Sequence, residues 1–169
     1  MFKKWEVITM FGFFKKKNNG IELNAHMVGT VVELVNVPDE VFSSKMLGDG
    51  VAIEPKEGVL YSPCDAEVVQ VFPTKHAVGL KTKEGLEILL HIGIDTVQMQ
   101  GEGFEAFVKE GDKVKKGDKL VVFDLNLVKE KAKSTITPML ITNMDMVEEL
   151  TVNSGDVNSN SVVATVKVK

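Results

Sequence analysis

Residues 66–95, AEVVQVFPTKHAVGLKTKEGLEILLHIGID, contain three short apolar runs that predict consecutive β-strands. The runs are Ala66–Phe72, Ala77–Thr82 and Glu87–His91, and aliphatic residues dominate all three. Pro73 and Gly85 fall between them, and these residue types are typical of turns. The stretch therefore predicts short strands rather than helices.

The same pattern continues from Gly20 to the C-terminus. Further candidate strands are Gly29–Val35, Gly50–Pro55, Leu120–Asp124 and Val162–Val168. Seven or more short strands predict an all-β fold, a single-domain antiparallel sandwich or barrel. A few short peripheral helices are expected at Asp39–Ser44, Phe104–Lys109, Asp124–Ala132 and Met144–Leu150.

Two internal repeats indicate a duplicated β unit. GTVVEL at residues 29–34 is echoed 37 residues later by AEVVQV at residues 66–71. In the second half, GDKVKKGDKL at residues 111–120 has a looser counterpart in GDVNSNSV at residues 155–162. The Gly-Asp pairs of this second repeat are expected at turns, because glycine supplies a positive φ there.

The composition fits one domain with an ordinary hydrophobic core: 169 residues, 44% of them hydrophobic. A single cysteine allows no internal disulfide and favours a reducing, cytoplasmic setting. The formal charge of −4 disfavours a nucleic-acid surface. All 20 basic residues are lysine, so a bound phosphate must be neutralised by lysine, histidine, backbone N–H groups or a partner's arginine.

Residues 1–19 are expected to form an N-terminal tail outside a domain that spans residues 20–169. The tail places aromatic residues between two lysine clusters. Its apolar run, Val7–Phe14, is far shorter than the ~20 residues needed to span a bilayer, and no signal-peptide cleavage site follows. Two alternatives stay open: weak contact of the tail with an anionic membrane surface, or a true start at Met10.

Few residues in the chain can carry chemistry. The sequence has three histidines and one cysteine, and it lacks a phosphate-binding P-loop, a G-x-S-x-G motif and a C-x-x-C pair. Cys64 is expected to be a small strand or turn residue.

Two of the histidines end apolar runs. Gly93 allows a sharp turn after His91, so that a backbone carbonyl can accept the Nδ1–H and leave Nε2 as a nucleophile. The hydroxyl of Thr74 can orient the ring of His76. The alternatives are that His91 is an ordinary core residue and that His76 is a solvated surface residue.

In their order and spacing, seven motifs resemble the glucose-type enzyme IIA of the bacterial phosphoenolpyruvate-dependent sugar phosphotransferase system. The motifs are PDEVF (38–42), GDG (48–50), TKH (74–76), HIGIDTV (91–97), GEGF (101–104), KAKST (131–135) and TP (137–138). The match runs from about Ile21 to the C-terminus and leaves only the tail outside.

This resemblance implies a phosphocarrier in sugar uptake. The chain would accept a phosphoryl group from the carrier protein HPr on Nε2 of His91 and donate it to a cysteine of the IIB domain of a sugar permease. By the same resemblance the Gly93 carbonyl holds Nδ1–H of His91, His76 stabilises the phosphoryl oxygens and Thr74 orients His76.

The resemblance also implies a docking surface around the two histidines. Asp39 and Asp95 would receive an arginine of HPr, a residue type that this chain lacks. The apolar part of the surface would comprise Val41, Phe42, Met46, Leu47, Phe72, Leu89 and Val97. Core packing is the alternative for each of these side chains.

Three residues depart from the family pattern. Leu89 stands where the family often has phenylalanine, which trims the docking surface and can change the choice of partner. His26 replaces a usual proline and Ala66 a usual glycine, and both are expected to lie away from the chemistry.

Three other classes of protein compete with this reading. A biotinyl or lipoyl carrier needs a lysine in a hairpin motif that is absent here. A zinc peptidase needs at least three protein ligands, and only His76 and His91 are expected to converge. No metal is therefore expected in the isolated chain, although a partner's carboxylate could complete a zinc site on those two histidines, as in enteric relatives. The third class, a regulatory binding module with little phosphotransfer, stays open.

Overall fold

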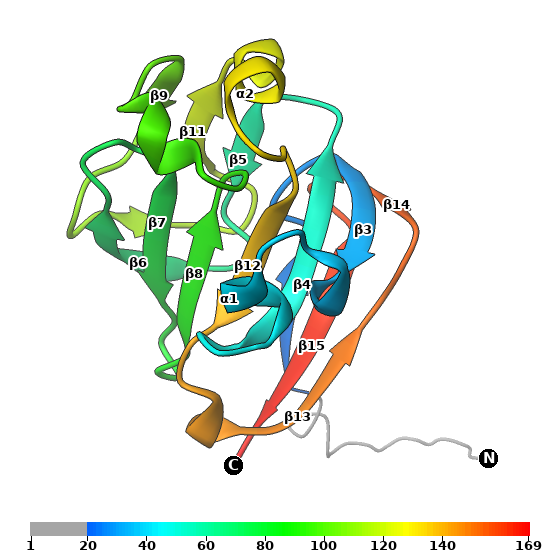
Figure 1. Cartoon of the computed structure of the whole chain (residues 1–169). Coiled ribbons are helices and arrows are strands. Elements are labelled where there is room, and N and C mark those ends of the chain that lie inside the picture. Colours follow the sequence, from blue (N-terminus) through cyan, green and yellow to red (C-terminus); the bar gives the residue numbers. More distant parts are fainter. Residues whose placement is uncertain (1–19) are drawn as a thin grey trace.

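The computed structural model describes residues 20–169, which fold into three antiparallel sheets with short helices at the periphery (Figure 1). Strands far outnumber helices, and all the sheet pairings are antiparallel, as the all-β prediction requires. The expected N-terminal tail, its membrane contact and the start at Met10 lie outside the described residues. No helix within residues 20–169 is long and apolar enough to cross a membrane.

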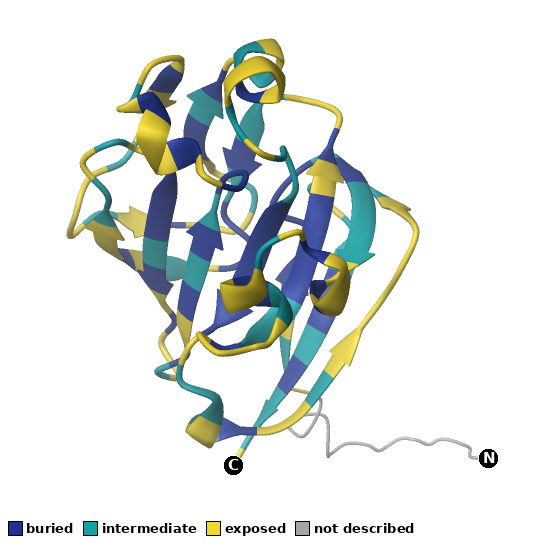
Figure 2. Ribbon diagram, in the orientation of Figure 1, coloured by how far each residue is buried: buried dark blue, intermediate teal, exposed yellow. Residues whose placement is uncertain are grey.

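The largest sheet has eight strands in the order β10-β6-β7-β8-β12-β4-β3-β14. Their bounds are Lys113–Val114 (β10), Ala66–Val71 (β6), Ala77–Lys81 (β7), Glu87–His91 (β8), Thr137–Ile141 (β12), Asp49–Pro55 (β4), Gly29–Glu33 (β3) and Asp156–Val157 (β14). Its central strands are largely buried, whereas the loops around them are exposed (Figure 2).

Two three-stranded sheets complete the fold. One has the order β5-β11-β9 and the other β13-β15-β2. Their strands are Val59–Tyr61 (β5), Lys119–Phe123 (β11), Phe104–Ala106 (β9), Val147–Val152 (β13), Val162–Val168 (β15) and Ile21–Asn24 (β2). The helices are α1 (Glu40–Ser43), α2 (Leu125–Lys131) and the 3₁₀ turns η3 (Leu34–Asn36), η4 (Thr96–Met99) and η5 (Met144–Met146).

The two faces of the large sheet bury different residues. In β8, Ile88 and Leu90 belong to the main core, whereas Leu89 packs on a smaller cluster that contains Phe42 of α1. Successive side chains of a strand point to opposite faces, so His91 lies on the same face as Leu89. The sheet therefore presents His91 on the side that α1 covers (Figure 1).

The two edges of the large sheet are built alike, as the internal repeat predicts. The paired residues are Ala66↔Val114 and Glu67↔Lys113 at one edge and Gly29↔Val157 and Thr30↔Asp156 at the other. The partners on β3 and β6 are 37 positions apart, which is the offset of the first repeat. In the second repeat, Asp156 occupies the position in the sheet that corresponds to Lys113. The Gly-Asp pairs of the sequence had instead matched Asp156 with Asp112, one position earlier.

All seven predicted strands are present, and Glu87–His91 and Val162–Val168 have the predicted bounds. Gly29–Val35 ends two residues early because η3 begins at Leu34. Most of the strands that the sequence did not predict have two to four residues, whereas β12 has five and β13 six. One of them, β12, contains Pro138 and is buried along its whole length.

Two of the four predicted helices are confirmed. They begin after Asp39 and Asp124, whose carboxylates accept hydrogen bonds from backbone N–H groups of the first turn.

The other two predicted helices are wrong. Phe104–Lys109 contains strand β9, because Phe104 pairs with β11 and its buried ring stacks on that of Phe123 at 5.9 Å. Met144–Leu150 forms only the η5 turn before β13 begins at Val147 and pairs with β15.

Candidate functional site

His91 is the last residue of β8, and the chain reverses direction immediately after it. The ring of Phe42 lies beside it, with the two ring centroids 5.0 Å apart. Gly93 follows with φ +66°, a left-handed conformation that favours glycine, and a Cβ there would meet Thr96 and Ser134 at less than 3.0 Å. His91 is therefore the residue at which β8 enters a tight turn.

His76 reaches the same place from the turn between β6 and β7. Phe72 N–H donates to Ala77 O at 3.0 Å, and the turn between them contains Lys75 with φ +64°. The backbone carbonyl of His76 accepts the N–H of Ile92 at 2.7 Å, which ties this turn to the end of β8. The two imidazole rings consequently lie edge to face, with centroids 4.9 Å apart and an interplanar angle of 81°.

Each ring has one nitrogen engaged by a neighbour two residues away. Nδ1 of His91 lies 2.8 Å from the carbonyl oxygen of Gly93. A carbonyl can only accept, so Nδ1 carries the hydrogen and Nε2 keeps its lone pair. Nδ1 of His76 lies 2.6 Å from the hydroxyl of Thr74, which can donate to it or accept from it.

The surroundings of both rings favour the neutral imidazole. Burial lowers the pKa of His91 below its usual value, although the hydrogen bond to Gly93 and the charges of Asp39 and Asp95 oppose this effect. Burial, with a smaller contribution from His91, lowers the pKa of His76 to about 4. Near neutral pH the site therefore offers an uncharged nucleophilic nitrogen beside a second uncharged imidazole.

The two aspartates expected at the docking surface both act on His91 electrostatically. The Asp39 carboxylate caps α1 by accepting the N–H of Val41 at 2.8 Å, and Asp95 adopts a left-handed conformation, φ +63°, before η4. Asp95 is exposed and Asp39 half-buried. Acidic groups therefore lie near the rings and stay accessible to a cationic partner group.

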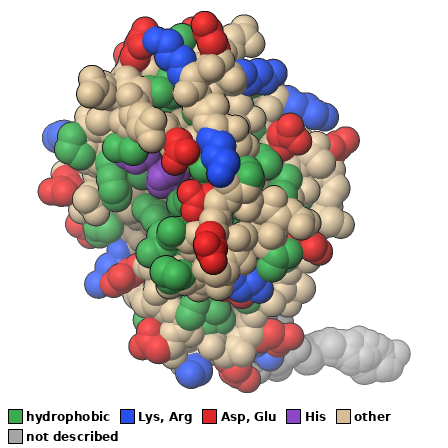
Figure 3. Space-filling model, viewed as in Figure 1, with side chains coloured by type: hydrophobic (Ala, Val, Ile, Leu, Met, Phe, Trp, Pro, Cys, Tyr) green, Lys and Arg blue, Asp and Glu red, His purple; other side chains and the backbone are tan. Residues whose placement is uncertain are grey.

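The expected apolar surface divides into exposed and buried parts. Val41, Met46, Leu47 and Val97 are exposed, and Phe72 and Leu89 are half-buried. Phe42 differs from the expectation: it is 6% exposed and packs in the small core under α1, so it forms the floor beside His91 rather than the outer surface. Figure 3 shows hydrophobic and acidic side chains next to the exposed parts of the histidines.

The third histidine lies closer to this site than expected. His26 is fully buried, and its Nε2 lies 2.8 Å from the carbonyl oxygen of Thr137. The hydroxyl of Thr137 in turn accepts the N–H of Gly93 at 3.1 Å. The expectation that His26 lies away from the chemistry is therefore wrong, because a single residue, Thr137, connects it to the His91 turn. Ala66, at the start of β6, is half-buried at the opposite end of that strand from the histidines.

Thr96 and Thr137, which contact the His91 turn, were not predicted as site residues. Both fall within the quoted HIGIDTV and TP motifs, which is the only signal that could have drawn attention to them. The contact of Thr137 with the Ile92–Gly93 peptide depends on the tertiary fold, because Thr137 is 44 positions away from Gly93 in the chain.

Other reactive groups in the described residues are poorly placed. Burial raises the pKa of the Cys64 thiol to about 12, which leaves it protonated and unreactive. Within residues 20–169, no three histidine, cysteine or acidic side chains gather as metal ligands. Among residues 20–169, His76 and His91 are the one pair of imidazole rings in contact.

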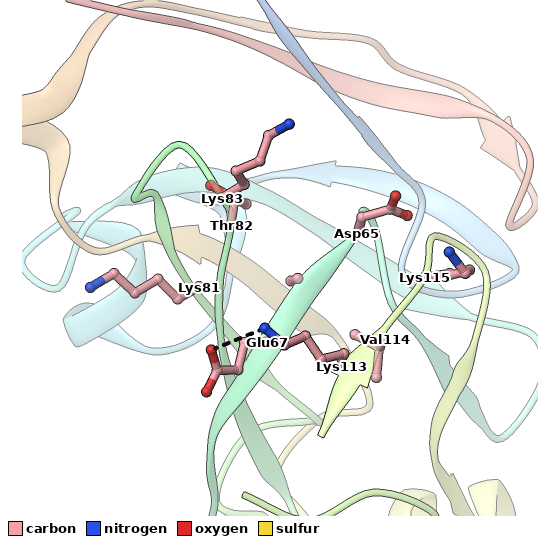
Figure 4. A pocket seen from close by; sticks show the side chains of 9 residues that line it. Asp65, Glu67, Lys81, Thr82, Lys83, Lys113, Val114 and Lys115 are labelled. Carbon is pink, nitrogen blue, oxygen red and sulfur yellow. Dashed lines mark ion pairs between the residues drawn. The ribbon is translucent and has the colours of Figure 1, made fainter. Parts of the chain in front are cut away.

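A hollow of about 560 Å³ lies at the far end of β6 and β7 from the histidines (Figure 4). Lys81, Lys83 and Lys115 border it, but their side chains point away from one another, and Lys113 pairs with Glu67 at 4.0 Å. The ammonium groups do not converge on a common point, so this hollow is not built as an anion site.

Comparison with known proteins gives consistent matches. The model of the family described as "phosphoenolpyruvate-dependent sugar phosphotransferase system, EIIA 1" matches residues 21–147. The glucose-specific EIIA component of the phosphotransferase system from Bacillus cereus is 51% identical over 168 residues, covering 99% of this chain and 98% of the relative. The component of the same name from Halalkalibacterium halodurans is 54% identical over 151 residues, covering 86% and 84%.

A solved structure has the same fold. Glucose permease IIA from Mycoplasma capricolum superimposes with a TM-score of 0.83 at 44% sequence identity, covering 89% of this chain and 98% of that one.

Proposed function

The chain belongs to the EIIA 1 family of the phosphoenolpyruvate-dependent sugar phosphotransferase system and is a phosphocarrier in sugar uptake, and we propose that it carries its phosphoryl group on His91. The observation that supports this site is the pairing of His91 Nδ1 with the Gly93 carbonyl, which leaves Nε2 unprotonated beside His76. The two relatives reported above are named glucose-specific EIIA components, and glucose is accordingly the proposed sugar.

Two transfers make up the cycle. In the first, the Nε2 lone pair of His91 attacks the phosphorus of a donor phosphohistidine, so that one N–P bond forms while the donor's N–P bond breaks. In the second, a thiolate of the acceptor attacks the same phosphorus, an S–P bond forms and the electron pair of the broken bond returns to Nε2. Little covalent chemistry is asked of the protein, because in-line transfer depends on positioning and charge neutralisation.

His76 is the group that stabilises the phosphoryl oxygens in this scheme, by donating a hydrogen bond from its neutral imidazole. If the Thr74 hydroxyl donates to Nδ1 of His76, the hydrogen of that ring is on Nε2 and can be donated to a phosphoryl oxygen. The edge-to-face contact of the rings supports this role, since it keeps His76 next to the reacting nitrogen. Donors of this kind act most strongly when charge develops in the transition state.

We assign the donor as HPr and the acceptor as the IIB domain of a sugar permease. The exposed apolar residues Val41, Met46, Leu47 and Val97, with Asp39 and Asp95 among them, are the proposed docking surface for both partners. An arginine from the donor would supply a guanidinium group, which this chain does not contain because all its 20 basic residues are lysine. The transfer belongs in the cytoplasm on this proposal, because the phosphoryl groups originate from phosphoenolpyruvate.

No resident metal takes part in the proposed cycle. Two imidazole nitrogens are too few for a zinc site, and a carboxylate from a bound regulatory partner would have to complete it.

The test separates the two transfers by means of His76→Gln. With charged HPr as donor and a purified IIB domain as acceptor, wild type should run both steps and His91→Ala neither. His76→Gln should still accept but pass the group on about 100-fold more slowly, because one lost transition-state donor costs about that much. If folded wild type accepts nothing from charged HPr, the chain is a regulatory binding module on the same fold.

A further inference from the structure

We propose that Thr96 and Thr137 are positioning residues that hold the Ile92–Gly93 peptide between their hydroxyl groups and thereby fix the tautomer of His91. The kinetic consequence of this inference rests on the proposed function, but its structural content does not.

The two threonines bind the two polar groups of one peptide unit, the C=O and the N–H of Ile92–Gly93. The hydroxyl of Thr96 donates to the carbonyl oxygen of Ile92, and the N–H of Gly93 donates to the hydroxyl oxygen of Thr137 at 3.1 Å. The peptide is planar, so binding its C=O and its N–H together fixes its rotation about the chain. The two threonines therefore set the backbone direction entering Gly93.

The next peptide is fixed as well, by the backbone. The N–H of Ile94 donates to Ser134 O at 2.9 Å. With the peptides on both sides of Gly93 held, its φ of +66° is determined, and its carbonyl oxygen points back at Nδ1 of His91. The direction of this carbonyl decides which ring nitrogen carries the hydrogen, and hence whether Nε2 is free.

The hydroxyls are committed to this arrangement. Thr96 and Thr137 are both fully buried. A buried hydroxyl is costly unless it is hydrogen-bonded, and a valine of the same shape would avoid that cost. The Thr137 hydroxyl donates to Thr135 O at 3.0 Å, so the N–H of Gly93 approaches its lone pairs.

His26 holds Thr137, one of the two threonines that clamp the Ile92–Gly93 peptide, in place from the core. Its Nε2–H donates to the carbonyl oxygen of Thr137, and Thr137 has no exposed surface through which water could replace that bond. Burial lowers the pKa of His26 to about 4, so this donor is a neutral imidazole near neutral pH.

The test compares Thr137→Val with Thr137→Ser, and Thr96→Val with Thr96→Ser, since serine keeps the hydroxyl and valine keeps the shape. The first readout is the ¹⁵N NMR signature of the His91 ring in the unphosphorylated protein. Wild type and the serine variants should show hydrogen on Nδ1 alone, whereas the valine variants should show a mixture with hydrogen on Nε2. The second readout is the rate of phosphoryl acceptance at saturating HPr, which should fall about 10-fold to 100-fold in the valine variants and recover with serine.

Urea unfolding of all four variants separates positioning from simple stability, because serine and valine should each lower stability while only valine changes the tautomer. Valine variants with the wild-type tautomer and rate would overturn the proposal. If Thr137→Val does not fold, Thr96→Val decides the question alone. A wild type that accepts no phosphoryl group would refute the proposed function, whereas the NMR readout would still confirm or refute the clamp.

Discussion

At the scale of single residues, the three histidines have different roles because their partners differ. Nδ1 of His91 meets a carbonyl, Nδ1 of His76 meets a hydroxyl, and Nε2 of His26 meets a carbonyl deep in the core. A carbonyl fixes the tautomer of its partner, whereas a hydroxyl permits both. His91 is therefore committed to an unprotonated Nε2, while His76 can become a donor.

The buried His26 should make the protein sensitive to acid. Its pKa is about 4 in the folded state against a usual 6.5, so below pH 6.5 the unfolded chain binds a proton more readily. The stability that comes from keeping His26 neutral is fully present above pH 6.5, and it is lost progressively as the pH falls towards 4. Between pH 7 and pH 4.5 the free energy of unfolding of wild type should fall by about 2 kcal/mol more than that of His26→Gln.

Glutamine is the matched replacement because its side-chain amide can still donate to Thr137 O but cannot titrate. Urea unfolding at the two pH values measures the difference, and the contribution of His76 is common to both proteins. Curves for wild type and His26→Gln that shift in parallel would show that His26 does not titrate as its burial requires.

At the scale of elements, the site depends on the ends of two neighbouring strands. The register that pairs Ala77 with His91 places the turn of His76 directly over the end of β8. The sequence predicted β7 and β8 well because their aliphatic runs end at turn residues. That the two histidines meet was given by the family resemblance, since strand pairing cannot be read from the runs themselves.

The helices predicted at Phe104–Lys109 and Met144–Leu150 were wrong for a related reason. Both segments are short, and over six or seven residues the spacing of apolar side chains fits a helix or a strand equally well. Long-range pairing with β11 and β15 decided the outcome. The contacts of His26 and Thr137 with the His91 turn were also beyond prediction, because they join segments 111 and 44 positions apart.

Substitution of Gly93 tests the turn after β8. Gly93→Ala should lower the free energy of unfolding by about 2 kcal/mol more than Gly111→Ala. Both glycines have a positive φ, +66° and +94°, so both variants carry backbone strain. Only at Gly93 would the new Cβ also collide, with Thr96 Cγ2 at 2.7 Å and Ser134 O at 2.9 Å.

Urea unfolding of the two variants measures this difference. Equal losses at the two positions would mean that the space around the His91 turn is not closed as the structure has it.

At the scale of the whole molecule, the histidines share one face with hydrophobic side chains and with acidic ones (Figure 3). The chain is acidic overall and contains no arginine. A patch of this kind suits brief contact with a partner that brings its own cation.

Val97→Gln should weaken this contact without affecting the fold. Val97 is 51% exposed near the histidines, and replacing it with a polar side chain should raise the KM for HPr about fivefold, which corresponds to about 1 kcal/mol. Its matched control is Val152→Gln, because Val152 is 40% exposed on β13, outside the docking surface. Steady-state transfer from HPr gives both values, and an equal KM for the two variants would place the docking surface elsewhere.

The most direct test of the central claim is intact-mass spectrometry at alkaline pH after incubation with phosphoenolpyruvate, enzyme I and HPr. Wild type should gain one phosphoryl group, the group should be lost in acid as expected for phosphohistidine, and His91→Ala should gain none. Phosphorylation of His91→Ala to the wild-type level would contradict the account, because the phosphoryl group would then reside on another residue.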